Sequence, residues 1–152
     1  MQKKVLVILI WLASPLAMLA QNPDEAEVKA VITSLFDGMR AADSAKVRAA
    51  FAPGAMMQTI RNNGQSPVEV FGDKPEGFIK SIAGQSRDVL DEQITFASFY
   101  SDGQLATVVT PYKFFYKGSF SHCGINSFQL VKFTDGWKIQ YIIDTRKKTG
   151  CD

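Results

Sequence analysis

Several signatures of catalytic and cofactor chemistry are missing from this 152-residue sequence. It has no glycine-rich phosphate loop, no serine in a nucleophile-elbow pattern, and no cluster of Cys, His and carboxylate residues at metal-ligand spacing. Its single histidine, His122, is the only imidazole that could act as a general base. These absences weigh against metal and nucleotide chemistry, so we expect neither a metal nor a cofactor.

An excess of charge of either sign is also missing. The formal net charge is +2, and removing Lys3 and Lys4 with an N-terminal leader leaves 15 basic residues against 15 acidic ones. A neutral protein with scattered charges has no long-range field that attracts nucleic acid or an acidic membrane. The one basic cluster, residues 146–148, is interpreted as the solvated end of a strand rather than a phosphate site.

Long hydrophobic runs occur only at the start of the chain. Two lysines precede an apolar run over residues 5–12, and small or apolar residues continue to Ala20. This pattern predicts a signal peptide over residues 1–20, with cleavage near Ala20. Because Ser14 and Pro15 interrupt a stretch shorter than the roughly 20 residues of a spanning helix, a retained anchor is the weaker alternative. We therefore expect a periplasmic or secreted protein with no membrane contact after cleavage.

Residues 21–152 are long enough for one domain with a single core. The first half predicts three helices that begin after the capping residues Asn22, Asp43 and Asp73, with a short hairpin between the second and the third. From Asp91 onward apolar residues alternate, which indicates strands joined by short turns. The expected strands are residues 93–100, 105–116, 119–133 and 137–146. Helices followed by an antiparallel meander predict an α+β fold, in which three N-terminal helices back a curved antiparallel sheet.

The order of these elements is similar to that of the nuclear transport factor 2-like superfamily over residues 24–146, with "FAPGA" after the second helix and "DGWKI" opening the last strand. The segment "FSHCGINSFQLVKFTDGWKIQYIIDTRKK" resembles the exported branch called putative lumazine-binding proteins. The resemblance implies a cone-shaped α+β roll, also called cystatin-like, with a pocket at its open end and frequent assembly into dimers. The fold carries both enzymes and proteins that only bind, so it does not choose between them.

The turns of the last two hairpins predict which side chains face the helices. A two-residue turn at residues 135–136 would pair Thr134 with Trp137, and a turn at residues 117–118 would fix the preceding hairpin. Aromatic and aliphatic walls with a few polar groups fit a site for a small apolar or aromatic molecule. The expected ligand-binding residues are Lys113, Phe115, His122, Asn126, Phe128, Tyr141 and Ile143. A solid core is the alternative interpretation of the same faces.

Three functions fit this pattern. The first is a binding module for a small apolar or aromatic ligand. The second is an enzyme of the cyclase, isomerase or dehydratase type, with His122 or Asp144 as weak candidates for the proton carrier. The expected register puts these two residues on opposite faces unless a bulge near Asn126 and Ser127 turns the strand. The third is an interaction domain. In this third case, the outer face of the sheet would form the interface of a homodimer through an aromatic stripe of Tyr112, Phe114 and Tyr116.

The two cysteines, Cys123 and Cys151, are predicted to form a disulfide, because export places them where such a bond persists. In the expected register Cys123 lies opposite Lys148, so Cys151 is on an unpaired tail. A tail that folds back, or one extra residue bulged near Asn126, would bring the two cysteines within disulfide distance. Two free thiols are the alternative.

Overall fold

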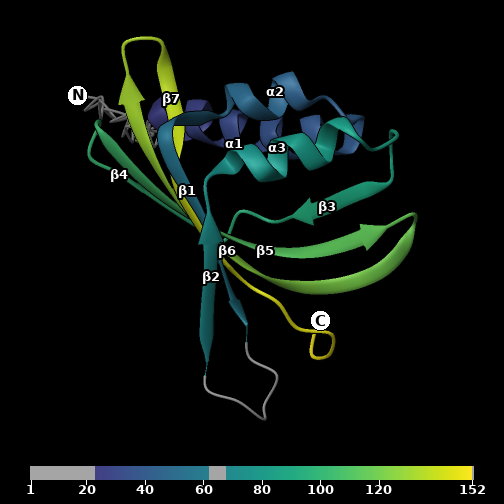
Figure 1. The fold of residues 1–152 in the computed structure, drawn as a ribbon. Coiled ribbons are helices and arrows are strands. Elements are labelled where there is room, and N and C mark those ends of the chain that lie inside the picture. Colours follow the sequence, from purple (N-terminus) through teal and green to yellow (C-terminus); the bar gives the residue numbers. More distant parts are fainter. Residues whose placement is uncertain (1–22, 62–67, 152) are drawn as a thin grey trace, which may run out of the picture.

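Three helices cover one face of a curved sheet: α1 (Pro23–Ala41), α2 (Ser44–Ala49) and α3 (Pro75–Ala83) (Figure 1). The computed structural model describes residues 23–61 and 68–151, and the predicted signal peptide lies outside them. Within these residues no helix is long and apolar enough to cross a membrane. The buried side of α1 is the stripe of apolar residues spaced by three and four: Val28, Ile32, Leu35 and Met39.

The starts of α2 and α3 differ in how they are capped. Asp43 caps α2 as predicted, because its side chain accepts a hydrogen bond of 2.9 Å from the backbone N–H of Lys46. The predicted cap Asp73 is wrong, since this residue ends a strand and α3 begins after Lys74 with Pro75 in its first turn. Proline has a fixed φ and no N–H to satisfy, so the helix can start without a side-chain cap.

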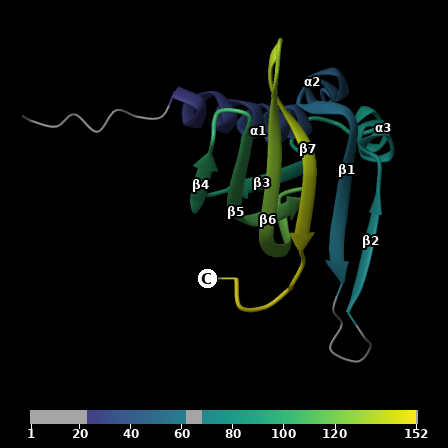
Figure 2. The ribbon, with the colours of Figure 1, turned by 90° about the vertical axis from the view of Figure 1, so that its left-hand side faces the viewer.

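The sheet has seven strands in the order β2-β1-β7-β6-β5-β3, with β4 paired beside β3 on β5 (Figure 2). All pairs are antiparallel except β1 with β7, which is parallel. The predicted strand over residues 93–100 is divided into β3 and β4. The strands are β1 (Phe51–Arg61), β2 (Glu69–Asp73), β3 (Leu90–Ile94), β4 (Ser98–Ser101), β5 (Leu105–Tyr116), β6 (Ser119–Phe133) and β7 (Gly136–Thr145).

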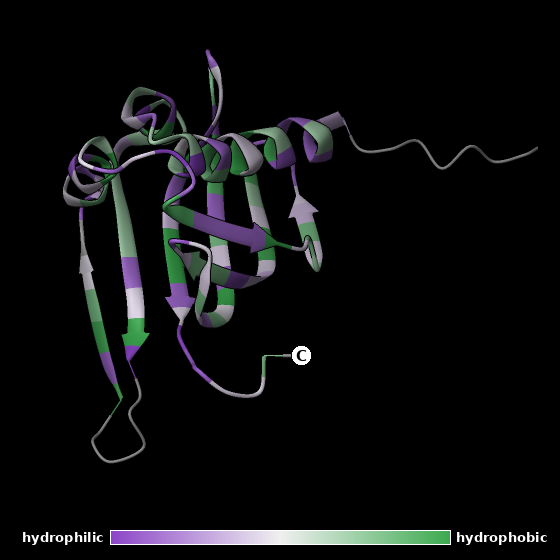
Figure 3. Cartoon of the chain, turned by 90° about the vertical axis from the view of Figure 1, so that its right-hand side faces the viewer, coloured by the Kyte–Doolittle hydropathy of each residue, from purple (hydrophilic) through white to green (hydrophobic). Residues whose placement is uncertain are grey.

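The core lies between the helices and the inner face of β5, β6 and β7. Buried and more exposed positions alternate along these strands, and most of the buried side chains are apolar. Figure 3 shows the hydropathy of each residue along the chain. The largest fully buried side chains include Phe128, Leu130 and Ile139 from the sheet and Ile32 and Ile82 from the helices. The α+β class with helices backing a curved sheet is confirmed.

The loop between β6 and β7 differs from the expected two-residue turn at residues 135–136. Phe133 pairs with Gly136, so residues 134–135 form the loop, and Gly136 has a φ of 112°. A turn followed by a glycine with positive φ is a common hairpin loop, and this glycine belongs to the second strand rather than to the turn. The first pairs of the hairpin are therefore displaced by two residues from the predicted pairs.

A second irregularity, at residues 129–130 of the same hairpin, changes which side chains face the helices. Beyond it Phe128 pairs with Ile142, whereas the expected register pairs it with Ile143. Because side chains alternate along a strand, a displacement of one residue moves the side chains of β7 beyond the irregularity to the opposite face of the sheet. Tyr141 and Ile143 consequently lie on the outer face.

The hairpin between β5 and β6 has the predicted turn at residues 117–118 but not the predicted pairs beyond it. A shift after the first two pairs makes Phe114 pair with His122. An extra residue in one strand is a β-bulge, which turns the following side chains over. The inner face here carries Phe114 and His122, whereas Lys113 and Phe115 lie on the outer face.

Candidate functional site

A cavity of about 500 Å³ lies between the helices and the inner face of the sheet. The helices pass above β5 and β6, which curve away beneath them (Figure 1). Cavities of this size commonly hold small molecules. Its apolar walls include Leu35, Phe36, Phe78, Phe114, Phe128 and Ile142.

Asp144, near the end of β7, is the centre of one polar group on the cavity wall. It accepts hydrogen bonds from the hydroxyl of Tyr112 at 3.1 Å, from Nε of Arg146 at 2.9 Å and from Oγ1 of Thr59 at 2.5 Å. The same tyrosine hydroxyl is 2.9 Å from the carbonyl oxygen of Thr145. Burial and the nearby carboxylates raise the pKa of Tyr112, so its hydroxyl remains a donor. Both oxygens of Asp144 are therefore engaged.

Glu92, in the middle of β3, belongs to a second polar group. Asn126 donates from Nδ2 to Oε1 of Glu92 at 2.8 Å and to Oγ1 of Thr110 at 3.3 Å. The residue as a whole is partly exposed, but its carboxyl group is enclosed by protein. Burial raises the pKa of Glu92 to about 7, and the charge of Asp144 adds to this effect, whereas the bond from Asn126 opposes it. This carboxyl group can hold or release a proton at neutral pH.

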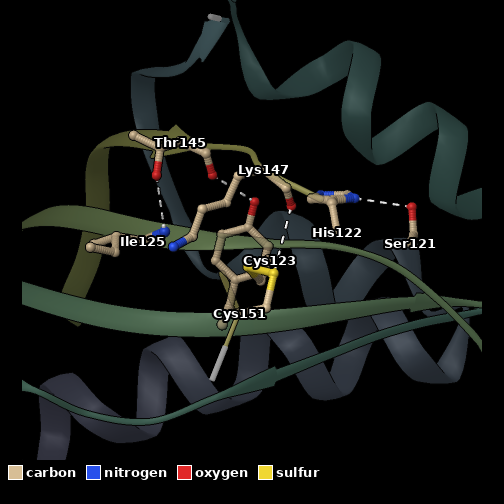
Figure 4. The surroundings of a disulfide bond; sticks show 8 residues. Ser121, His122, Cys123, Ile125, Thr145, Lys147 and Cys151 are labelled. Atoms are coloured by element: carbon tan, nitrogen blue, oxygen red, sulfur yellow. Dashed lines mark hydrogen bonds between the residues drawn. A yellow bond between two sulfur atoms is a disulfide. The ribbon is translucent and has the colours of Figure 1, made fainter. Parts of the chain in front are cut away.

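His122 lines the same cavity from β6. Its Nδ1 is 3.0 Å from Oγ of Ser121 (Figure 4), and its ring contacts those of Tyr112 and Phe114 at centroid distances of 5.7 and 5.0 Å. Burial lowers the pKa of His122, and the charge of Arg146 adds to this, so the imidazole is neutral at pH 7. His122 and Asp144 line one cavity, and the expectation that they lie on opposite faces is wrong.

The structure divides the seven predicted ligand-binding residues into two groups. Those that line the cavity are His122, Asn126 and Phe128. Those placed on the outer face are Lys113, Phe115, Tyr141 and Ile143. The inward orientation predicted for the second group is wrong because the two strand irregularities reverse the alternation beyond them. Lys113 instead borders a separate hollow beside the disulfide.

The predicted dimer face is wrong in two of its three residues. Tyr112 is 4% exposed, and both Tyr112 and Phe114 line the cavity. Only Tyr116 is exposed, at 45%. The prediction that all three residues face outward depends on the expected register of β5 and β6. The β-bulge in this hairpin changes that register, so Tyr112 and Phe114 face the cavity.

Sequence reasoning missed Glu92 and Arg146. Glu92 lies between Leu90 and Ile94 at alternating positions, and both neighbours pack against the core. A carboxylate within a buried apolar alternation is a signal that could have identified it. Arg146 was interpreted as part of a solvated strand end, but its guanidinium binds Asp144 and Thr59.

The predicted disulfide between Cys123 and Cys151 is present, with a Cα–Cα distance of 5.8 Å. The backbone N–H and C=O of Cys123 both bond to Lys147, each at 2.9 Å, so the chain after β7 continues along β6 before it turns back (Figure 4). This arrangement fixes the segment that carries Arg146 beside the cavity. In the described ranges, no three His, Cys, Asp or Glu side chains cluster as a metal site requires.

Residues 23–140 match the model of a family described as "Putative lumazine-binding". No curated protein sequence matches the chain.

Solved structures share the fold at low identity. An NTF2-like (nuclear transport factor 2-like) protein from Shewanella baltica OS155 is 16% identical, with a TM-score of 0.63 over 82% of this chain and 94% of that one. A domain with a cystatin-like fold from Nostoc punctiforme PCC 73102 is 17% identical, with a TM-score of 0.65 over 86% and 81%. A ketosteroid isomerase-like protein from Erwinia carotovora atroseptica SCRI1043 is 14% identical, with a TM-score of 0.60 over 83% and 98%.

Proposed function

Because this chain belongs to the family described as "Putative lumazine-binding" and has the nuclear transport factor 2-like fold, we propose that it binds a small apolar or aromatic molecule in the cavity between its helices and sheet. The cavity supports this proposal by its composition. Aromatic and aliphatic walls contribute most of the contact area for a flat ligand, and a few fixed polar groups orient it. Asn126 and Glu92 are such groups.

Blocking the cavity is expected to abolish binding. Gly77, on α3, lines the cavity, and a Cβ added there meets nothing within 4 Å. Gly77→Trp would add an indole to the cavity wall and reduce the space for a ligand. With naphthalene-2-carboxamide as a neutral aromatic probe, we expect the affinity to fall by about tenfold or more, since overlap with a bulky side chain costs at least about 1.4 kcal/mol. Isothermal titration calorimetry measures this change.

Lys80→Trp is the matched control for Gly77→Trp. Lys80 is exposed on the same helix and does not line the cavity, so the control keeps the wild-type affinity. Equal affinities for wild type, Gly77→Trp and Lys80→Trp would place the binding site elsewhere.

Native mass spectrometry of the protein from its own host would identify the class of a co-purifying ligand.

We further propose that the protein acts after export, as a periplasmic or secreted domain. The signal-peptide pattern of residues 1–20 and the Cys123–Cys151 disulfide support this location, because such bonds persist in oxidising compartments. Protein recovered from its host is expected to begin near Gln21. Its denatured, unreduced form should show no reactive thiol in a titration. A retained leader together with two reactive thiols would contradict export.

A further inference from the structure

Glu92 is a carboxyl group on the cavity wall that has no ionic partner among the residues the structure describes. It pairs across the strands with Phe114, and the cavity beside it is lined by Leu90 and Phe128. Its one hydrogen bond among the described residues is the one that Oε1 accepts from Asn126. No lysine or arginine of the described chain forms a salt bridge with it. Its second oxygen is therefore free to accept a hydrogen bond from a ligand.

Arg146 is the basic group of the described residues whose charge acts on Glu92, and it is already bound to other side chains. Arg146 donates from Nε to Asp144 and from Nη2 to Thr59, at 2.9 and 3.2 Å. Its positive charge is balanced by that of Asp144, so the pair leaves the charge of Glu92 uncompensated. The titratable and charged groups that line the cavity with Glu92 are Lys74, Tyr112, His122, Asp144 and Arg146. Of these, Lys74 is exposed to solvent, and Tyr112 and His122 are uncharged at pH 7.

We infer that the ligand of this cavity carries a planar, cationic N–H donor, such as an amidine or a protonated aminoheterocycle, that binds the carboxylate of Glu92. The inference rests on the proposed ligand-binding function and specifies the chemical class of the ligand. A buried charge is favourable only when a partner compensates it. A planar N–H cation supplies both the missing charge and donors for the free oxygen. Its aromatic body would lie against the phenylalanine walls.

Other ligand charges fit less well. An anion would lie beside two carboxylates, Glu92 and Asp144, of which only the second has a bound cation. A neutral ligand would leave Glu92 to be neutralised by a proton. A cation instead favours the ionised form, so its binding should expel the proton that Glu92 holds when its pKa is about 7.

Three probes with one naphthalene body separate these cases: naphthalene-2-carboxamidine is cationic, naphthalene-2-carboxamide neutral and 2-naphthoate anionic. At pH 8 we expect calorimetry of the purified protein to show the amidine binding about tenfold tighter than the amide, and the carboxylate binding more weakly than both. From pH 8 to pH 6 the amidine should lose about tenfold in affinity, because a group with a pKa near 7 is mostly ionised at the first pH and mostly protonated at the second. Buffers of different ionisation enthalpy should reveal proton release at pH 6.

Glu92→Gln tests the role of the residue directly. This variant should bind amidine and amide equally well, with no dependence on pH between 6 and 8. Asp91→Asn, a carboxylate on the neighbouring position of β3 that does not line the cavity, should keep the wild-type preference. Equal affinity of wild type for amidine and amide, or an unchanged preference in Glu92→Gln, would overturn the inference and leave the binding function standing. Failure of all three probes to bind would overturn the binding function and this inference with it.

Discussion

Gly124→Ala is expected to destabilise the protein by about 3 kcal/mol, the upper end of the range for inserting a group into a packed region. A Cβ on Gly124 would lie 1.8 Å from the carbonyl oxygen of Thr145 and 2.9 Å from the ring of Tyr112. That carbonyl accepts a hydrogen bond from the Tyr112 hydroxyl, which also binds Asp144. The methyl group would thus separate β6 from the end of β7 and break the polar group around Asp144.

Thermal or chemical unfolding measures this loss, which corresponds to a decrease in Tm on the order of 10 °C for a domain of this size. Gly77→Ala is the matched control. An added Cβ there meets nothing within 4 Å, and alanine is favoured over glycine in a helix by up to about 1 kcal/mol. The control should therefore be as stable as wild type or more so. A Gly124→Ala protein with wild-type stability would show that the strands can separate here at little cost.

Glu92→Gln is expected to stabilise the protein at pH 8 and to have little effect at pH 4. The folded state raises the pKa of Glu92 from its ordinary 4.5 to about 7, so the folded protein holds this proton more tightly than the unfolded chain does. Stability therefore falls as the pH rises from about 4.5 to about 7, and the penalty is fully present above pH 7. A shift of this size corresponds to roughly 3 kcal/mol, and the amide does not incur it.

The measurement is the difference in unfolding free energy between Glu92→Gln and wild type at several pH values. Taking the difference cancels the titration of all groups that the two proteins share. Asp91→Asn should show no comparable increase between pH 4 and pH 8. A stabilisation by Glu92→Gln that is the same at both ends of the range would contradict the raised pKa. A wild-type residue that lowers stability at neutral pH is typical of a functional site, and a cationic ligand would remove the penalty.

The family and the ligand-binding function do not depend on the predicted strand faces. The family follows from the match over residues 23–140, and the fold is the one shared with the solved structures. The proposed ligand chemistry depends on Glu92 and on its neighbours Asn126 and Arg146. Two of these three, Glu92 and Arg146, were not among the expected site residues. The expected apolar pocket with a histidine, an asparagine and a lysine is therefore replaced by a cavity that contains the carboxyl group of Glu92.

The sequence by itself determined the classes of the elements and their order. The apolar stripe of α1, the cap at Asp43 and the alternation after Asp91 are local patterns, and each depends only on residues within a few positions. The Cys123–Cys151 bond was also predictable, because only two cysteines are present and an exported chain favours pairing them. These features gave an α+β roll with its helices on one side.

Only the tertiary structure decided which side chains of the last three strands face the cavity. The alternation of a strand fixes two opposite faces, but the register decides which of them is inside. One irregularity in each hairpin reverses the alternation beyond it, and the local sequence pattern did not indicate the position of either one. Glu92 and Asp144 come together because strands distant in sequence meet in one sheet, and that proximity has no local signal.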